Sequence, residues 1–311
     1  MSADSPRRYA VLLVAYGAPQ SLDEVAPYLQ DVRGGRPTPP AVVEEVRRRY
    51  ARIGGRSPLL DRTREQAAGL EGFLGNGTPV FAGMRHWHPY IRDVLAAIGE
   101  DGFQRVVAIP LAPHYSRMSI GAYERALEEG RGLLEVAMVR EWYDHPRFLD
   151  AVTERVRAAL DRFDPSIRAE VPLLFTAHSL PQRILAEGDP YCAQLEASVA
   201  GVLTRLGRRD RGGGRFAFQS AGRTPEPWLG PDAAVVLEEL AGLGERQVVL
   251  CPIGFTSDHL EVLYDVDVEY QELASRLGIR LERTESLNAS PLLIEALADL
   301  VRSTAGSRGW A

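Results

Sequence analysis

The sequence predicts an α/β protein made of two similar domains, each built on a parallel sheet. Short β-branched apolar runs alternate with amphipathic helical segments along the whole chain, which is the pattern of parallel sheets covered by helices. The pattern restarts after a polar, turn-rich stretch at residues 162–168, and a length of 311 residues allows two domains. We therefore expect one domain over residues 1–165 and a second over 166–311, with the last helix a candidate to pack back on the first domain.

The first half alternates strands and helices from its first apolar run onward. Apolar runs bounded by turn residues predict strands at residues 9–15, 80–83, 106–111 and 135–141. Helical periodicity, preceded in the first case by the capping residue Ser21, predicts helices at 21–29, 42–53, 62–74, 90–98, 119–129 and 146–163.

The second half follows the same alternation. Apolar runs predict strands at residues 171–176, 216–219, 248–251 and 279–282. Helices are predicted at 190–205, 232–241, 257–273 and 291–303.

Two pairs of segments repeat each other, which favours a duplication. Residues 89–110 and 231–252 align without gaps, and both stretches begin and end with proline. The stretch AYGAPQ at residues 15–20 is likewise echoed by AHSLPQ at 177–182. The two halves are therefore expected to be Rossmann-like copies of one unit, with Tyr16 and His178 at corresponding strand ends. Because ligands of open α/β sheets bind at such ends, both residues are candidates to approach one ligand in a cleft between the domains.

Composition excludes several classes of function. All 36 basic residues are arginine, which excludes Schiff-base chemistry, pyridoxal phosphate catalysis and a P-loop, since each needs a lysine. The net charge of −6 argues against a general nucleic-acid binder. Only Cys192 and Cys251 are present, too few for a four-cysteine zinc or iron–sulfur site. No apolar signal core and no membrane-spanning stretch is present, so we expect a soluble, cytoplasmic protein.

An acidic helix is expected after the strand at residues 248–251. Glu261, Asp265 and Glu269 are spaced four residues apart, which places three carboxylates along one face of that helix. A line of carboxylates that starts at the end of a parallel strand suggests a path for a cation, the alternative being a solvated acidic face. Because a spacing of four drifts by about 40° per step around an ideal α-helix, we expect a π-type widening that keeps the line straighter.

His178 ends an apolar run at the carboxyl end of an expected strand. Its imidazole can be neutral near pH 7, so it is a candidate general base or metal ligand, the alternative being a hydrogen-bonded structural histidine. Together with Glu261 it could bind a divalent first-row ion loosely or accept protons. His86 and His88 resemble a second metal pair but lack a third ligand nearby in the sequence.

An arginine-rich segment lies in the first half of this otherwise acidic chain. Seven arginines fall between residues 33 and 56 with few acids among them. Because arginine pairs bidentately with carboxylates, the segment predicts an anionic substrate, although some of these arginines are expected only to decorate a helix. Tyr28, Tyr50 and Ser57 are interleaved with them and offer ring faces and a hydroxyl.

Together these motifs resemble the ferrochelatase family, whose members insert Fe2+ into a porphyrin. The resemblance covers nearly the whole chain in order, and it looks closest to the soluble, cluster-free branch that acts on coproporphyrin III, a tetracarboxylate, in Gram-positive-type bacteria. The matching stretches are LLVAYGAP at residues 12–19, RYARIGGRSPL at 49–59, LAPHYS at 111–116, TAHSLP at 176–181, GDPY at 188–191, QS at 219–220, PWLGP at 227–231 and PIGFTSDHLEVLYD at 252–265.

The resemblance implies a role for each matching position. His178 and Glu261 match the catalytic pair that receives iron and takes up the pyrrole protons, and Tyr16 matches a residue that ligates iron from the opposite porphyrin face. Asp265 and Glu269 match the outer carboxylates of a second, relay-like metal site, which could hold a divalent cation such as Mg2+. The positions that match the family's hold on the macrocycle and its propionates are Arg33, Arg49, Tyr50, Ser57 and Tyr123.

The expected reaction is therefore insertion of Fe2+ into coproporphyrin III to give Fe-coproporphyrin III (coproheme) in haem biosynthesis, with no organic cofactor and no iron–sulfur cluster. The alternatives are a protoporphyrin IX ferrochelatase, another tetrapyrrole chelatase, and a non-catalytic porphyrin or haem carrier on the same scaffold. The joint presence of His178 and Glu261 argues against the carrier, which needs a single axial ligand. A monomer with no nucleic-acid partner is expected, and the resemblance implies transfer of the product to a downstream decarboxylase of the haem pathway.

Overall fold

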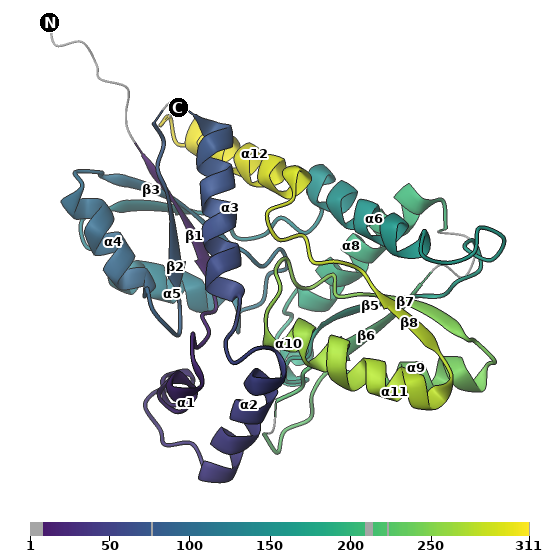
Figure 1. Ribbon diagram of the computed structural model, residues 1–311. Coiled ribbons are helices and arrows are strands. Elements are labelled where there is room, and N and C mark those ends of the chain that lie inside the picture. The colour runs from purple at the N-terminus through teal and green to yellow at the C-terminus, as the bar shows by residue number, and fades with distance from the viewer. Residues whose placement is uncertain (1–8, 76, 209–213, 223, 311) are drawn as a thin grey trace, which may run out of the picture. The chain divides into compact units, whose positions relative to one another are not determined.

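The computed structural model describes residues 9–75, 77–208, 214–222 and 224–310 (Figure 1). Contacts within this part of the chain define two compact units. Unit 1 contains the described residues of Met1–Pro113, Arg117–Trp142 and Asn288–Ala311, and unit 2 contains those of His114–Ser116 and Tyr143–Leu287. Each unit is built on a four-stranded parallel sheet, which confirms the predicted fold class.

The sheet of unit 1 has the strand order β2-β1-β3-β4. Its central strand β1 is an unbroken apolar run that is buried at every position, as expected for a parallel strand with helices on both faces. The strands are β1 (Ala10–Ala15), β2 (Val80–Met84), β3 (Arg105–Pro110) and β4 (Glu135–Met138). The helices are η1 (Leu22–Glu24), α1 (Val25–Val32), α2 (Pro40–Arg52), α3 (Leu59–Leu74), α4 (Ile91–Glu100), α5 (Ile120–Gly130) and α12 (Pro291–Ser307).

The sheet of unit 2 has the strand order β6-β5-β7-β8. One face of this sheet is covered by an apolar core that includes Leu237, Leu250 and Val266. The strands are β5 (Leu173–His178), β6 (Arg215–Gln219), β7 (Gln247–Cys251) and β8 (Arg280–Arg283). The helices are α6 (Pro146–Leu160), α7 (Arg183–Ala186), α8 (Tyr191–Leu206), α9 (Ala233–Gly242), α10 (Leu260–Leu263), the π-helix η2 (Asp265–Tyr270) and α11 (Gln271–Leu277).

The two units share one topology. The first strand of each unit, β1 or β5, lies between the second and third strands, and the fourth strand lies at the edge beside the third. The repeated sequence segments form α4 and β3 in unit 1 and α9 and β7 in unit 2. The proline at the start of each repeated segment makes an equivalent contact. The carbonyl of Pro89 accepts the N–H of Met84 at 2.7 Å, and the carbonyl of Pro231 accepts the N–H of Phe218 at 2.8 Å. The predicted duplication is therefore confirmed.

The units do not divide at residue 165 as expected, and the boundary moves to Trp142 and Tyr143. Helix α6 belongs to unit 2, because it packs against α8, β7 and β8 and buries Phe148 and Val156 completely. Helix α12 belongs to unit 1, where it packs along α3 and against β3 and β4 (Figure 1). The side chain of Gln66 on α3 donates to the carbonyl of Asn288, just before α12, at 2.9 Å.

The single helix expected over residues 257–273 is divided into α10, η2 and α11. His259 has an extended backbone with φ −159°, so the helical part starts only at Leu260. The carbonyl of Tyr264 accepts the N–H groups of both Val268 and Glu269 at 3.0 Å, so four-residue and five-residue spacings coexist. One extra residue is therefore accommodated in the turn, and the predicted π-type widening is confirmed.

Short helix α7 was not predicted from the sequence. No helix in the described ranges combines the length and the apolar character needed to cross a membrane.

Candidate functional site

His178 and Glu261 meet in unit 2. His178 is the last residue of β5, and Glu261 lies in α10, which follows the neighbouring strand β7. The distance from His178 Nδ1 to Glu261 Oε2 is 3.0 Å, within hydrogen-bond range. A Cβ added at Gly254 would lie 2.6 Å from the Cβ of Ala177, so only glycine lets the loop after β7 approach β5 this closely. The fold thus brings together the two residues for which catalysis was expected.

Electrostatics favours a charged His178–Glu261 pair. Burial alone would raise the pKa of Glu261, but His178 and His259 outweigh burial and hold the pKa of this carboxyl well below its ordinary value. Burial alone would lower the pKa of His178, but the charge and hydrogen bond of Glu261, with the charge of Asp265, raise this pKa overall. Each side chain is 33% exposed, so the pair remains accessible to an incoming ion. Because a metal ligand must be deprotonated, a cation that binds here would compete with the proton on His178.

His259 is a third member of this group that was not singled out from the sequence. Its Nδ1–H donates to the carbonyl of Ser257 at 3.0 Å, which leaves Nε2 facing Glu261 Oε2 at 3.8 Å. The imidazole also packs on the ring of Phe255, with 4.7 Å between ring centroids. His259 lies outside the helix, so helical spacing did not link it to Glu261. The sequence carried no local signal for this contact, because the stretch was expected to be helical, and residues two apart on a helix do not face each other.

Buried polar side chains hold the backbone beneath the pair. Gln219 donates from Nε2 to the carbonyl of Glu261 at 2.8 Å and accepts at Oε1 from the hydroxyl of Thr176 at 2.7 Å. Gln219 and Thr176 are fully buried, and an unpaired polar group there would cost about 1–3 kcal/mol. The hydroxyl of Tyr191 donates to the carbonyl of His178 at 3.0 Å. Helix α10 is thereby tied to β5 and β6, and the strand end that carries His178 is fixed as well.

The expected outer carboxylates, Asp265 and Glu269, both lie on the π-helix η2. Asp265 is only 5% exposed and accepts a short hydrogen bond from the hydroxyl of Ser220, whereas Glu269 is exposed. Within the described ranges, no group of three or more His, Cys, Asp and Glu side chains is arranged to hold one metal ion. His178 and Glu261 therefore offer an open pair of ligands, and the metal-binding roles of Asp265 and Glu269 stay a prediction.

In unit 1, Tyr16 stands directly after β1 and is 42% exposed. Its ring packs against the imidazole of His86 at a centroid distance of 4.7 Å, and the guanidinium of Arg85 lies 5.8 Å from the ring centroid. His86 Nδ1 lies 2.9 Å from Asp31 Oδ1, and the hydroxyl of Tyr90 donates to Asp31 Oδ2 at 3.0 Å. Asp31 and Tyr90 thus orient His86, and His86 supports the ring of Tyr16. The sequence did not link these residues to Tyr16, because they come from different elements.

The two arginines expected to hold propionates also lie in unit 1. Arg33 follows α1 and is exposed. Arg49, in the last turn of α2, pairs with Glu45 one turn earlier at 3.2 Å, and 26% of its side chain is exposed. A surface ion pair of this kind contributes less than about 1 kcal/mol, so a carboxylate of a ligand could replace Glu45 at little cost.

The three hydroxyl residues expected beside the macrocycle are buried: Tyr50 is 3% exposed, Ser57 0% and Tyr123 5%. Ser57 Oγ accepts the N–H of Leu59, the first residue of helix α3, at 3.3 Å. Burial raises the pKa of Tyr123 far above its ordinary value. These residues support the site-bearing segments from within unit 1, and their direct contact with a ligand stays a prediction.

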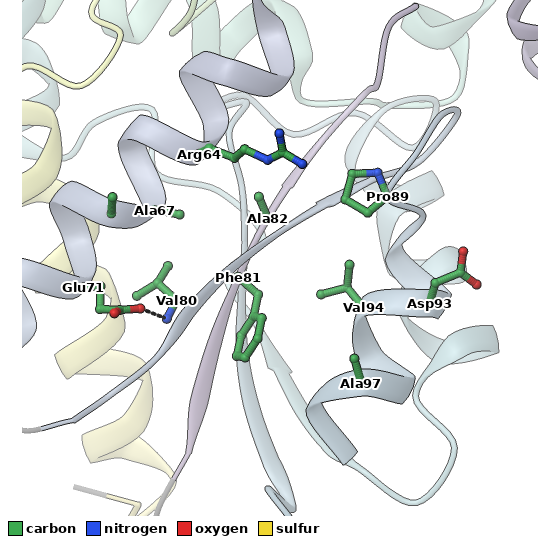
Figure 2. Close-up of a pocket in the computed structure, with 11 residues that line it drawn as sticks. Arg64, Ala67, Glu71, Val80, Phe81, Ala82, Pro89, Asp93, Val94 and Ala97 are labelled. Atoms are coloured by element: carbon green, nitrogen blue, oxygen red, sulfur yellow. Dashed lines mark hydrogen bonds between the residues drawn. The ribbon is translucent and has the colours of Figure 1, made fainter. Parts of the chain in front are cut away.

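A groove of about 560 Å³ lies beside the edge strand β2, lined by residues of α3 and α4 (Figure 2). None of the candidate site residues lines this groove. Glu71 accepts the N–H of Val80 at 2.9 Å, and Pro89 accepts that of Met84 at 2.7 Å. These contacts occupy outward amides at both ends of β2, which is how proteins protect a sheet edge from further pairing. The groove therefore lies along a sheet edge that is protected from pairing with a further strand.

The two α/β units, each on a parallel four-stranded sheet, resemble the fold of solved chelatases. The solved structure of SirB from Bacillus subtilis with Fe3+ matches with a TM-score of 0.57 and 15% identity over 97% of this chain and 98% of that chain. DR2241 from Deinococcus radiodurans, described as a multi-domain protein with structural similarity to chelatases, matches with a TM-score of 0.54 and 19% identity over 94% of this chain and 55% of that chain. At these identities the likeness concerns the fold alone.

Sequence comparison narrows this class. The ferrochelatase family model matches residues 8–305. The ferrochelatase of Herpetosiphon aurantiacus is 43% identical over 300 residues, covering 94% of this chain and 97% of the relative. The coproporphyrin III ferrochelatase of Geobacillus thermodenitrificans is 38% identical over 308 residues, covering 96% of each. The chain belongs to the ferrochelatase family, so the predicted membership is confirmed, and the protein is an enzyme of haem biosynthesis.

Proposed function

We propose that this protein inserts Fe2+ into coproporphyrin III, with release of the two pyrrole protons, to form Fe-coproporphyrin III. The observation that carries metal insertion is the His178–Glu261 pair, whose side chains lie 3.0 Å apart and remain partly exposed. The choice of coproporphyrin is supported by relatives of that name in two Geobacillus species, at 38% and 39% identity. It is also supported by Arg33 and Arg49, because a tetracarboxylate substrate suits arginine donors.

The charges of the pair suggest a division of labour. Glu261 has a lowered pKa and stays ionised, so we assign it as the residue that binds the incoming Fe2+ first. The cation then favours loss of the proton from His178, because both positive charges compete for the same carboxylate. The neutral imidazole formed in this way can accept a pyrrole proton and pass it to solvent. Two protons leave the porphyrin for each Fe2+ that enters, so charge is conserved.

The remaining roles are proposals that follow the family resemblance. We assign Tyr16 as an iron ligand in the product, and Arg33 and Arg49 as partners of the propionates. We assign Asp265 and Glu269 to an outer site for a second divalent cation such as Mg2+. No organic cofactor is needed, since the chemistry consists of metal binding and proton transfer.

The test is an anaerobic mixture of the protein, Fe2+ and coproporphyrin III, followed by the change of the porphyrin absorption spectrum. The wild-type protein is expected to convert the spectrum to that of the iron porphyrin. His178→Ala is expected to slow insertion on the order of 100-fold or more, because a positioned acid–base group typically contributes that much. His88→Ala is the matched control, since this exposed histidine lies outside the pair.

Two results would overturn parts of the proposal. If His178→Ala inserts iron at the wild-type rate, the pair does not carry the reaction. If protoporphyrin IX is converted with a higher kcat/KM than coproporphyrin III, the protein is a protoporphyrin ferrochelatase instead.

A further inference from the structure

Arg283, at the end of strand β8, holds the π-helix by its side chain. Its Nε and Nη2 donate to the two carboxylate oxygens of Asp267 at 2.5 and 2.8 Å, a bidentate pair. Its Nη1 donates to the carbonyl of Thr284 at 2.9 Å and lies 3.9 Å from Asp258 Oδ1. Only 16% of the Arg283 side chain is exposed, so these contacts are partly shielded from solvent.

The two carboxylates held by Arg283 lie on either side of Glu261 in the chain. Asp258 precedes His259 at the start of α10, and Asp267 lies within η2. Strand β8 is itself paired with β7 in register, with Leu250 opposite Arg283. One guanidinium on the sheet thus contacts both ends of the segment that carries Glu261, and so limits how far that segment can shift.

The segment needs such support for two physical reasons. A π-turn has poorer backbone geometry than an α-turn and persists only where tertiary contacts hold it. The segment also carries several carboxylates within twelve residues, among them Glu261, Asp265 and Glu269, whose mutual repulsion opposes close packing. The positively charged guanidinium of Arg283 offsets both effects. It holds the π-turn in place, and it neutralises part of the negative charge of the segment. The Gln271 side chain adds a second tie to β8 by donating to the Leu281 carbonyl at 3.0 Å.

We propose that Arg283 is a positioning residue for metal insertion, which holds Glu261 at its distance from His178 through its bidentate pair with Asp267 and its charge beside Asp258. This inference rests on the proposed function of the His178–Glu261 pair. Arg283 does not contact that pair, and it acts through the backbone of α10 and η2.

The test compares Arg283→Gln and Arg283→Lys with Arg280→Gln. Arg280 lies on the same strand and donates to Glu282 at 2.8 Å and to the carbonyl of Arg162 at 2.9 Å, and neither of these contacts reaches η2. Arg283→Gln is expected to lower kcat and to raise the KM for Fe2+, with a combined loss in kcat/KM of about tenfold, as for other residues that orient a metal ligand. The KM for coproporphyrin III is expected to stay unchanged.

Arg283→Lys is expected to recover part of the loss, because lysine keeps the charge but cannot form the bidentate pair. Asp267→Asn is expected to reproduce most of the effect of Arg283→Gln, and the double variant should be no worse than Arg283→Gln alone, since both substitutions remove the Arg283–Asp267 pair. If Arg283→Gln and Arg280→Gln change the two KM values and kcat alike, Arg283 is merely structural and the inference is wrong.

Two readouts do not depend on turnover. Amide hydrogen exchange over residues 258–270 should accelerate about tenfold in Arg283→Gln and stay at the wild-type rate in Arg280→Gln. The affinity of the His178–Glu261 pair for Co2+, followed by visible absorption, should fall in Arg283→Gln only. Should the wild-type protein fail to insert iron, the proposed function fails, and these two readouts still decide the clamp: unchanged exchange and unchanged Co2+ affinity would refute it.

Discussion

At the scale of single residues, His114 is a buried histidine whose environment keeps it neutral. It is 3% exposed, and its Nε2 lies 2.9 Å from the hydroxyl oxygen of Ser198. That hydroxyl donates to the carbonyl of Tyr143 at 2.7 Å, so it accepts from His114, whose proton is therefore on Nε2. Burial lowers the pKa of His114 to about 3. His114 thus serves as a neutral structural donor within unit 2.

This environment predicts a pH-dependent stability. An unfolded chain protonates His114 below its ordinary pKa of about 6.5, whereas the folded protein does not do so until about pH 3. The unfolded state therefore binds the extra proton in this window, and stability falls as the pH falls. Between pH 7 and pH 5 the loss from this residue should be about 2 kcal/mol.

The measurement is urea unfolding at pH 7 and pH 5 of the wild-type protein, His114→Gln and the control His88→Ala. His114→Gln should be less stable at pH 7 but should lose about 2 kcal/mol less than the wild type on acidification. His88→Ala should keep the wild-type pH dependence. Equal pH dependence in wild type and His114→Gln would show that His114 titrates normally in the fold.

The candidate residues show which parts of a site can be predicted from a sequence. His178 and Glu261 were found because a strand end and a helical spacing are both local patterns. Gln219, which holds the carbonyl of Glu261, belonged to a recognised motif but received no role, since its contact joins residues far apart in the chain. Tyr50 was expected beside the substrate, and its burial depends on packing that no local pattern encodes.

At the scale of elements, the π-helix η2 is the departure from regular structure that places the carboxylates. Most strands and helices were predicted within a few residues, because the periodicity of apolar residues is set by the buried face of each element. The spacing of Glu261, Asp265 and Glu269 predicted a π-type widening in this helix. It did not predict that the helix would be divided into α10, η2 and α11. Helix α7 was missed, since four residues are too few to show a periodic pattern.

Removing one residue from η2 should restore a regular helix and displace the acidic line. Deleting Val268 leaves Val266 and Tyr270, which are both buried in the core of unit 2, three residues apart and still on one helix face. The deletion rotates Glu269 by about 100° relative to the residues before it. We expect a folded protein in which iron insertion is slowed about tenfold or more, since ligand geometry is lost. The control is Val268→Ala, which keeps the residue count and should insert iron at nearly the wild-type rate. If the deletion variant is fully active, the π-turn is dispensable for iron insertion.

At the scale of the whole molecule, the two units are related by duplication, yet the chain passes between them several times. The segment His114–Ser116 belongs to unit 2, the chain then returns to unit 1 until Trp142, and α12 belongs to unit 1 again. The sequence showed the duplication through repeated motifs. The assignment of α6 and α12 could not be predicted in the same way, because an amphipathic helix shows that one face is buried but not which partner covers it.

This assignment predicts which fragments of the chain fold alone. A fragment of residues 143–287 keeps α6 on α8, β7 and β8, and loses only the segment 114–116 that bonds to Ser198 and Gln194. A fragment of residues 166–311, divided at the boundary expected from the sequence, lacks α6 and carries α12 without its partners α3, β3 and β4. We expect the first fragment to unfold cooperatively on heating and to give a dispersed amide spectrum, because each of its sheet faces remains covered. The second should bind hydrophobic dyes and unfold without a cooperative transition, since two apolar surfaces are exposed at once. A cooperative transition in the second fragment, together with its absence in the first, would place α6 and α12 in the units opposite to those described.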